Sequence, residues 1–273
     1  MTVLIVLAGL LISHLLTDVV RWRNFEWLLW PIRALRTRVP DPAWLPMVLV
    51  LLIGILVPAL ATWLATALMG TVGWILLGLA AFIYTLGPRD LDHDVATLLE
   101  RSAAEDMAHL DETAEAMQLD LDGSADEAAA AVFHGALSRW FGILFWFVVL
   151  GIPGAVLYRL NRIALQMNDL GEPEIDWLAR MRIVLDWPVQ ALMMIGVGLC
   201  GDLDRVWRAW QELREERPAW LITPSQLDRI AHVIVPSDAT FDDGLSAGHR
   251  MVWRVLVLWL VVMSVMLLAG LLA

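Results

Sequence analysis

Four charged residues stand at the borders of apolar runs, where polar chemistry can meet an apolar setting. Arg89 ends one run, Arg159 and Arg162 end a second, and Asp186 begins a third. An arginine can bind a phosphate or carboxylate through two parallel hydrogen bonds, whereas a lysine offers a point charge. The pattern predicts that these four residues converge at one membrane surface and bind an anionic ligand.

Two chain neighbours, Asp90 and Tyr158, are included as ligand-binding candidates because they adjoin Arg89 and Arg159. The alternative is that the arginines only anchor the protein, with apolar stems in the bilayer and guanidinium groups at the lipid headgroups. The sequence leaves both interpretations open. It predicts no catalytic residue, no metal ligand and no cofactor, because it contains no GxSxG, HExxH or P-loop motif.

The element that must position the second pair of arginines is the uncharged run 140–158. It is at the lower limit of the roughly 17–25 residues that a membrane-spanning helix needs. Gly151, Pro153 and Gly154 interrupt it, and Pro153 should break a straight helix. Because lipid does not tolerate unpaired backbone groups, the break must be buried in protein or line a wet cavity. The segment is therefore predicted to be re-entrant or interfacial.

The composition is that of an integral membrane protein. Apolar residues make up 59% of the chain, above the roughly 45–50% of soluble domains, and the 15 tryptophans gather near the ends of apolar runs. The net charge of −11 argues against a nucleic-acid partner. Cys200 is the single cysteine, so the sequence permits no internal disulfide and no cysteine-based metal cluster.

The apolar runs predict an all-α, polytopic fold forming a single membrane domain over residues 1–273. Four segments are expected to span the bilayer, with the first retained rather than cleaved as a signal peptide: 2–17, 45–65, 70–86 and 251–272. The segments 140–158 and 188–200 are expected to be embedded without crossing, since the apolar part of the latter is too short to span.

Residues 87–138 are predicted to form a cytoplasmic helical insertion that contains an acidic helical hairpin. Leu91, Val95, Leu98 and Leu99 recur at helical spacing and should form one buried face. A similar stripe follows from position 107 to 117. The hairpin is a candidate surface for a protein partner.

Arginine placement predicts the topology. With four spans, the loop 18–44 and the region 87–250 share one side, and every arginine except Arg254 falls there. That side is expected to be the cytoplasm, with the N-terminus outside and residues 18–41 as an amphipathic helix among lipid headgroups. We therefore expect a multi-pass protein of the bacterial inner membrane in contact with lipid.

Several shorter patterns resemble functional motifs. The GxGxxG match at 196–201 lacks a βαβ context and is interpreted as small residues that let helices approach closely. The stretch from Asp120 to Gly123 resembles part of a calcium loop, but acids are missing at both ends of that loop. It is therefore interpreted as a turn that connects two helices.

Two interpretations stay open for the polar cluster of Asp90, Asp92, His93 and Asp94. The acids could bind a divalent cation, or they could favour the dipole at a solvated helix start. His14, inside the first apolar run, is either a polar contact between helices or a functional group.

Three stretches together resemble the AmpE family of bacterial inner-membrane proteins and, more distantly, the CobD/CbiB family of cobinamide-phosphate synthases. They are LGPRDL at 86–91, the run from FWF at 145–147 to LYR at 157–159, and LDWPV at 185–189 with GD at 201–202. The first resemblance implies a non-enzymatic modulator or sensor associated with peptidoglycan recycling and β-lactamase induction, with a small cell-wall or nucleotide ligand as a candidate partner. The second implies a membrane-embedded, amide-forming enzyme with a cobalamin-like substrate; a small-molecule transporter is a further alternative.

Two departures favour the AmpE branch. The CobD-like enzymes carry an Asn-Thr-Leu-Asp-type sequence where this chain has NRIA at 161–164, and both families usually have Pro-x-Arg-Leu where it has PVQA at 188–191. Loss of an arginine from the second motif should remove two-point binding of a phosphate or carboxylate. The sequence therefore favours a modulator or sensor without enzymatic activity, and it leaves the membrane-embedded enzyme and the transporter open as alternatives.

Overall fold

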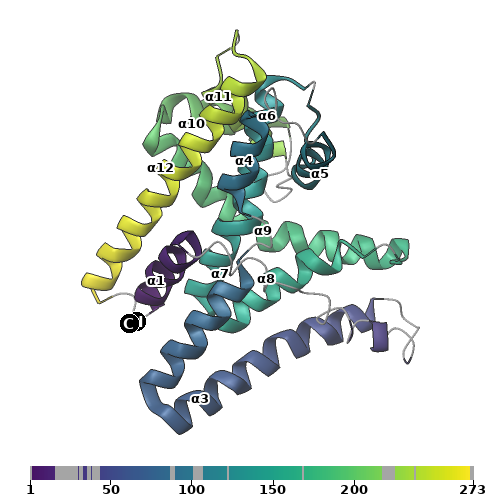
Figure 1. Cartoon of the computed structure of the whole chain (residues 1–273), viewed down its shortest axis with the longest axis vertical. Coiled ribbons are helices and arrows are strands. Elements are labelled where there is room, and N and C mark those ends of the chain that lie inside the picture. Colours follow the sequence, from purple (N-terminus) through teal and green to yellow (C-terminus); the bar gives the residue numbers. More distant parts are fainter. Residues whose placement is uncertain are drawn as a thin grey trace. The chain divides into compact units, whose positions relative to one another are not determined.

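A computed structural model of the chain describes residues 2–15, 30, 33–35, 38, 44–86, 90–100, 107–121, 123–167, 169–216, 225–236 and 238–270. Every element among these residues is helical, which confirms the all-α prediction (Figure 1). The chain divides into two compact units. Unit 1 comprises Met1–Pro88, Gly142–Asp186 and Met263–Ala273, and unit 2 comprises Arg89–Phe141 and Trp187–Val262.

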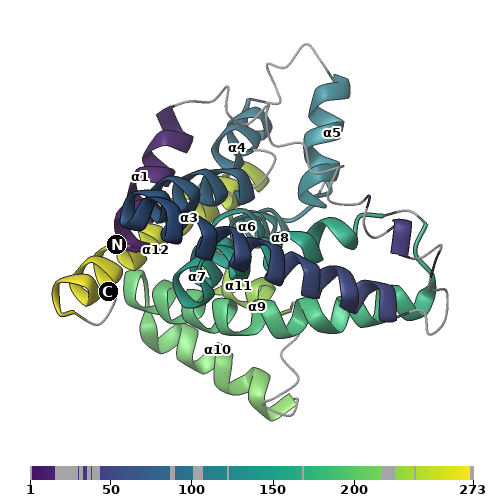
Figure 2. The ribbon, with the colours of Figure 1, turned by 90° about the horizontal axis from the view of Figure 1, so that it is seen from below.

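In the described part of unit 1 the longer helices are α1 (Thr2–Leu15), α3 (Leu45–Thr85), α7 (Gly142–Leu150) and α8 (Ile152–Ala164). The first half of α9 (Glu172–Cys200) also belongs to it. Helices α7 and α8 pack against each other and against α3, and Figures 1 and 2 both show them side by side. This packing positions the predicted arginines of α8.

Helix α3 doubles back on itself (Figure 1), and its two arms correspond to the predicted spans 45–65 and 70–86. The kink lies at Gly70, whose φ of 61° is a backbone conformation that glycine adopts without steric cost. Close packing follows on the far side of the turn. A side chain at Gly73 would collide with the backbone of Ala65, so this position must stay small.

The predicted break in the run 140–158 is confirmed, although its cause differs from the prediction. Helix α7 ends at Leu150, and Gly151 has a φ of 69° before α8 begins. Pro153 lies in the first turn of α8, where a missing N–H is tolerated. The left-handed glycine therefore makes the break, and the proline starts the next helix.

Unit 2 contains α4 (Leu91–Leu99), α5 (Met107–Met117), α6 (Ala125–Ala136), a π-helical turn (Leu137–Phe141), α10 (Leu203–Glu216), α11 (Ser225–Ile234) and most of α12 (Phe241–Leu268). The predicted apolar faces of the hairpin are confirmed except at Leu99, which is only half-buried. Leu91, Val95 and Leu98 of α4 are buried, as are the described stripe residues Leu110, Ala114 and Met117 of α5.

The start of α6 follows from its sequence. Ser124 accepts a hydrogen bond from the backbone of Glu127, and the Glu127 carboxylate accepts one from the backbone of Ser124, which is a capping box. The connection before it is a turn, as predicted, because Gly123 N donates to Asp120 O at 3.0 Å. Asp122, within this turn, lies outside the described residues.

Four helical segments are long and apolar enough to cross a membrane: Leu45–Thr85, Ala125–Leu150, Glu172–Cys200 and Phe241–Leu268. The number agrees with the prediction, but the positions differ. The first contains both predicted spans 45–65 and 70–86, and the 14 residues of α1 fall short of the roughly 17–25 that a span needs. The chain is thus a multi-pass membrane protein in which α1 is not among the candidate spans.

The two segments predicted to be embedded without crossing belong in part to longer helices. The apolar run after Pro188 continues a helix that starts at Glu172, and α7 continues the alanine-rich α6. The helices are longer than the apolar runs because alanine and polar residues extend the helices beyond those runs. Pro188 costs α9 a backbone hydrogen bond without ending it.

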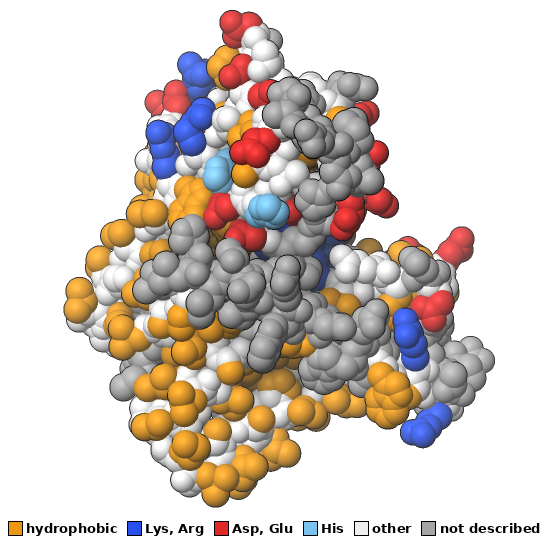
Figure 3. Space-filling view, in the orientation of Figure 1, with side chains coloured by type: hydrophobic (Ala, Val, Ile, Leu, Met, Phe, Trp, Pro, Cys, Tyr) orange, Lys and Arg blue, Asp and Glu red, His pale blue; other side chains and the backbone are white. Residues whose placement is uncertain are grey.

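The surface of α3 is suited to lipid. Hydrophobic side chains gather over it in Figure 3, and the most exposed include Leu56, Leu60, Trp63 and Leu68. Contiguous apolar exposure of this kind marks an interaction surface rather than a solvated face. Most of the predicted interfacial helix at 18–41, and the side chain of His14, lie outside the described residues.

Candidate anion-binding site

Two helices of unit 1 bring three of the predicted residues together. Tyr158 and Arg162 are one turn apart on α8, and Arg182 and Asp186 are one turn apart on α9. Residues four apart share a helix face, so each helix offers one pair to the other. Tyr158, Arg162 and Asp186 were predicted site residues; Arg182 was not.

The four side chains form one hydrogen-bonded network around the Asp186 carboxylate. Tyr158 Oη donates to Oδ1 at 2.8 Å, and Arg162 Nη2 lies 3.0 Å from Oδ1 and 2.9 Å from Oδ2. The same Nη2 donates to Tyr158 Oη at 2.8 Å, and Arg182 Nε approaches Oδ2 at 3.4 Å. One carboxylate therefore holds two guanidinium groups and a phenol.

Contacts outside the network fix the two helices against each other. Asn161 Nδ2 donates to Leu178 O at 3.2 Å, and Trp146 Nε1 of α7 donates to Leu185 O at 3.0 Å. The lack of a side chain at Gly142 makes room for the Tyr158 ring and hydroxyl. These contacts hold the network in one geometry before any ligand arrives, as a binding site requires.

The charge of the network favours an anion. Two arginines and one aspartate leave a formal surplus of one positive charge, and Arg162 and Asp186 are only 12% and 5% exposed. Arg162 Nε is buried and has no hydrogen-bond partner among the described residues. The side chain of Arg182 is 36% exposed. A phosphate or carboxylate ligand could thus approach the exposed guanidinium of Arg182 and be held there together with the Nε donor of Arg162.

The phenol contributes a neutral group. Burial raises the pKa of Tyr158 above its ordinary value, so the hydroxyl stays protonated and can donate to Asp186. The Arg162 guanidinium carbon lies 5.3 Å from the centre of the Tyr158 ring, within cation–π range. Tyr158 therefore orients both charged partners without adding charge.

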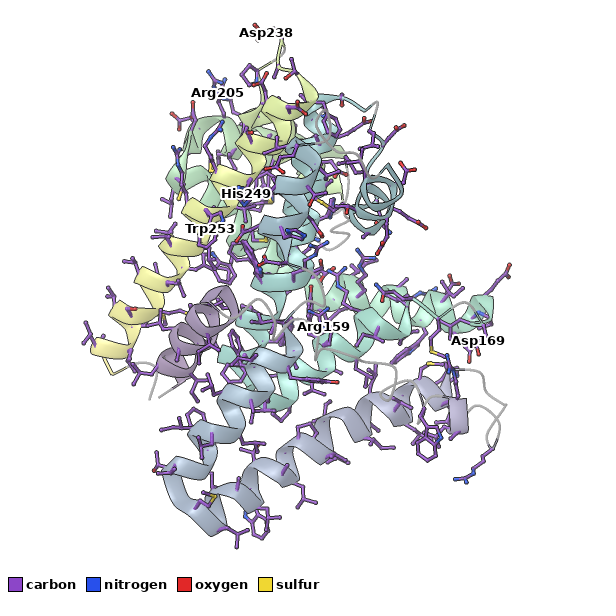
Figure 4. All side chains as sticks on the ribbon, in the orientation of Figure 1. Arg159, Asp169, Arg205, Asp238, His249 and Trp253 are labelled. Atoms are coloured by element: carbon purple, nitrogen blue, oxygen red, sulfur yellow. The ribbon has the colours of Figure 1, made fainter. Side chains whose placement is uncertain are left out.

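The other predicted residues have different positions. Arg159, labelled in Figure 4, donates through Nε to Thr85 O at 2.7 Å and so ties α8 to the end of α3. Asp90 belongs to unit 2, where it accepts from the backbone of Asp92 at 3.1 Å and caps α4. Arg89 lies outside the described residues. Neither Arg159 nor Asp90 is part of the Asp186 network.

Arg182 was missed because it lies inside a polar stretch rather than at the border of an apolar run. A signal was present, since Arg182 and Asp186 have the four-residue spacing of a helical ion pair. That signal requires a continuous helix through 172–188, which the apolar runs of the sequence do not predict.

The acids at the start of α4 are engaged by other side chains and by the backbone. Asp94 pairs with Arg139 at 2.6 Å, and Asp92 accepts from His249 and Trp253. No group of three His, Cys, Asp or Glu side chains is placed to hold a metal ion within the described part of the chain. The acids instead serve as a cap and as partners of other helices.

The GxGxxG match lies at the end of α9 and just beyond it, not in a phosphate-binding loop. A side chain at Gly196 would collide with Val255 of α12, and one at Gly201 would crowd Met251. The small residues therefore permit close helix packing, as predicted.

Known proteins resemble this chain in part. It is 31% identical over 176 residues to the cobalamin biosynthesis protein CobD of Stutzerimonas stutzeri, a match that covers 59% of this chain and 55% of that protein. It is 33% identical over 107 residues to the CobD of Chromobacterium violaceum, covering 38% and 33%. The chain thus matches about half or less of these curated relatives. No family model matches, and no solved structure does.

These comparisons overturn the prediction of an AmpE-type, non-enzymatic modulator of peptidoglycan recycling and β-lactamase induction. The prediction gave too much weight to the arginine missing from the 188–191 stretch. The structure places two other arginines, Arg162 and Arg182, on Asp186. The absence of one motif arginine therefore does not leave this part of the chain without guanidinium groups.

Proposed function

We propose that this protein is a membrane-embedded enzyme of cobalamin biosynthesis that forms an amide on a corrinoid substrate. The network of Tyr158, Arg162, Arg182 and Asp186 holds an anionic group of one substrate. The carrying observation is the buried Nε of Arg162, which has no hydrogen-bond partner in the described part of the chain. It belongs to a network of surplus positive charge, in a chain whose curated relatives are named CobD.

The roles of the four residues follow from their contacts. Arg162 and Arg182 bind the phosphate or carboxylate, Asp186 holds both guanidinium planes, and Tyr158 fixes Asp186. The protein lies in the bacterial inner membrane, with the acidic helices α4 and α5 on the cytoplasmic side where small anionic substrates are available. The apolar surface of α3 contacts the lipid.

The test is complementation of a bacterial strain that lacks its own CobD, with growth made dependent on cobalamin. Expression of this chain should restore growth, and mass spectrometry should detect the amide product of the corrinoid in cell extracts. Failure to restore growth at verified membrane expression, together with no corrinoid bound to the purified protein, would overturn the proposal. Corrinoid binding without product would favour a transporter.

A further inference from the structure

A second polar group, separate from the Asp186 network, lies within unit 2. His249 and Trp253, both labelled in Figure 4, are one turn apart on α12. Both contact Asp92 near the start of α4. His249 Nε2 lies 2.6 Å and Trp253 Nε1 2.8 Å from the same oxygen, Asp92 Oδ1. Trp140 packs edge-to-face on Trp253, with ring centres 5.5 Å apart, which fixes the indole.

The shared oxygen determines the tautomer of His249. An indole N–H can only donate, so Asp92 Oδ1 must accept from Trp253. The ionised carboxylate of Asp92 has only acceptor oxygens, so His249 Nε2 is the donor in its contact with Oδ1. In a neutral imidazole the other nitrogen, Nδ1, then carries the free lone pair.

That nitrogen is available to a ligand. Among the residues that the structure describes, no group hydrogen-bonds Nδ1 of His249, and the side chain is 27% exposed. Asp92 is 25% exposed, and its second oxygen has no described partner. An imidazole oriented by a carboxylate, with its second nitrogen open, has the arrangement of a general base with its positioning partner.

We propose that His249 is a general base that deprotonates an amine substrate, with Asp92 and Trp253 as positioning residues. The inference rests on the proposed function, because amide formation needs an amine nucleophile. An alkyl amine has a pKa similar to that of a lysine side chain, so it is protonated near neutral pH. Only about one molecule in a thousand or fewer is then the neutral amine with a free lone pair. A base that removes the proton supplies the reactive form.

The proton transfer is balanced within this group. The N–H bond of the substrate ammonium breaks, its electron pair stays on the amine nitrogen, and the proton passes to His249 Nδ1. Asp92 remains ionised throughout and stabilises the imidazolium that forms, while Trp253 keeps its N–H.

The neighbouring titratable and charged groups lie on the same two helices as the pair. On α4, Asp90 caps the helix, Asp94 pairs with Arg139 of the π-helical turn, and His93 is exposed. On α12, Arg250 follows His249 directly and Arg254 follows Trp253. Asp92 is the acidic side chain that contacts His249 among the described residues.

The experiment measures amide formation by membranes that contain the protein, supplied with a corrinoid carboxylate, a nucleoside triphosphate and a primary amine across pH. His249→Gln should lower kcat by about 10²–10⁴-fold with the KM for the corrinoid unchanged, and the acid limb of the profile should disappear. Asp92→Asn should move that limb to lower pH, because a neutral amide does not stabilise an imidazolium. His93→Gln, adjacent to Asp92 and exposed, is the matched control and should behave as wild type.

Carbethoxylation with diethyl pyrocarbonate, read by peptide mass spectrometry, gives a second measurement that needs no turnover. His249 should react in the folded protein, and Trp253→Phe, which keeps the ring shape, should change its rate. If His249→Gln keeps wild-type activity and an intact acid limb, His249 is not the general base. The proposed function is not affected by that outcome. No labelling of His249 under conditions that label His93 would overturn it too. If the wild type forms no amide product while His249 is labelled, the proposed function is overturned instead. The amine substrate proposed for His249 is then overturned as well.

Discussion

Arg162 and Asp186 are 24 residues apart in the chain, yet Nη2 of Arg162 lies between the two carboxylate oxygens of Asp186, 3.0 and 2.9 Å away. Tyr158 and Arg182 bind the same carboxylate, so the pair is the centre of a network rather than an isolated ion pair. A pair that only anchored the chain to lipid would present its guanidinium to the headgroups. Here the guanidinium is buried against a protein carboxylate.

Arg162→Lys tests the difference between a positive charge and a guanidinium. A lysine cannot contact Tyr158 and Asp186 while also offering the Nε donor, so we expect at least about a tenfold loss of corrinoid affinity, or roughly 1.4 kcal/mol. Complementation of cobalamin-dependent growth should fail at wild-type expression. Arg180→Lys, on the exposed side of α9, is the control and should complement fully. Full complementation by both variants would assign Arg162 a structural role.

Gly142→Ala tests the close approach of α7 to the network. The new methyl group would overlap the Tyr158 ring and hydroxyl, so the phenol must shift away from Asp186. Overpacking of this kind costs about 1–3 kcal/mol, and we expect a lower unfolding temperature in detergent and reduced activity. Gly171→Ala meets only ordinary contacts at 3.7 Å and should change neither. Equal stability of the two variants would contradict the assigned packing.

The buried ion pair of unit 2 predicts a non-additive response. Asp94 and Arg139 are 1% and 8% exposed, and Asp94→Asn leaves the arginine charge buried without its carboxylate. We expect a loss of about 3–5 kcal/mol, whereas the double variant Asp94→Leu with Arg139→Met should lose much less. Chemical unfolding in detergent measures both. Asp111→Asn, at an exposed position of α5, should be neutral, and a double variant as unstable as Asp94→Asn would refute the account.

Reporter fusions test the sidedness that the arginines predict. Alkaline phosphatase is active only when exported, so a fusion at Thr71, next to the kink of α3, should be active. A fusion at Asp120, in the turn before α6, should be inactive. Activity at Asp120 would place the acidic helices outside the cytoplasm and reverse the predicted topology.

The sequence by itself determined the local elements. Helical spacing fixed the buried faces of α4 and α5, the apolar runs predicted α3 and most of α12, and the Gly151–Gly154 stretch predicted the break between α7 and α8. These features depend on residues within a few positions of one another. Their energetics, such as the ease with which glycine takes a positive φ, act locally and can be read from composition and spacing.

The tertiary structure alone decided which polar groups meet. Arg159 and Arg162 look equivalent in sequence, but they lie on different faces of α8, so one reaches Thr85 and the other Asp186. The acids of α4 likewise separate into a cap, a partner of Arg139 and a partner of His249. Partner choice depends on how helices cross, and that is set by side-chain packing between segments distant in sequence. An arginine at the end of an apolar run therefore indicates where the boundary of that run lies. Which group the arginine binds depends on how the helices pack.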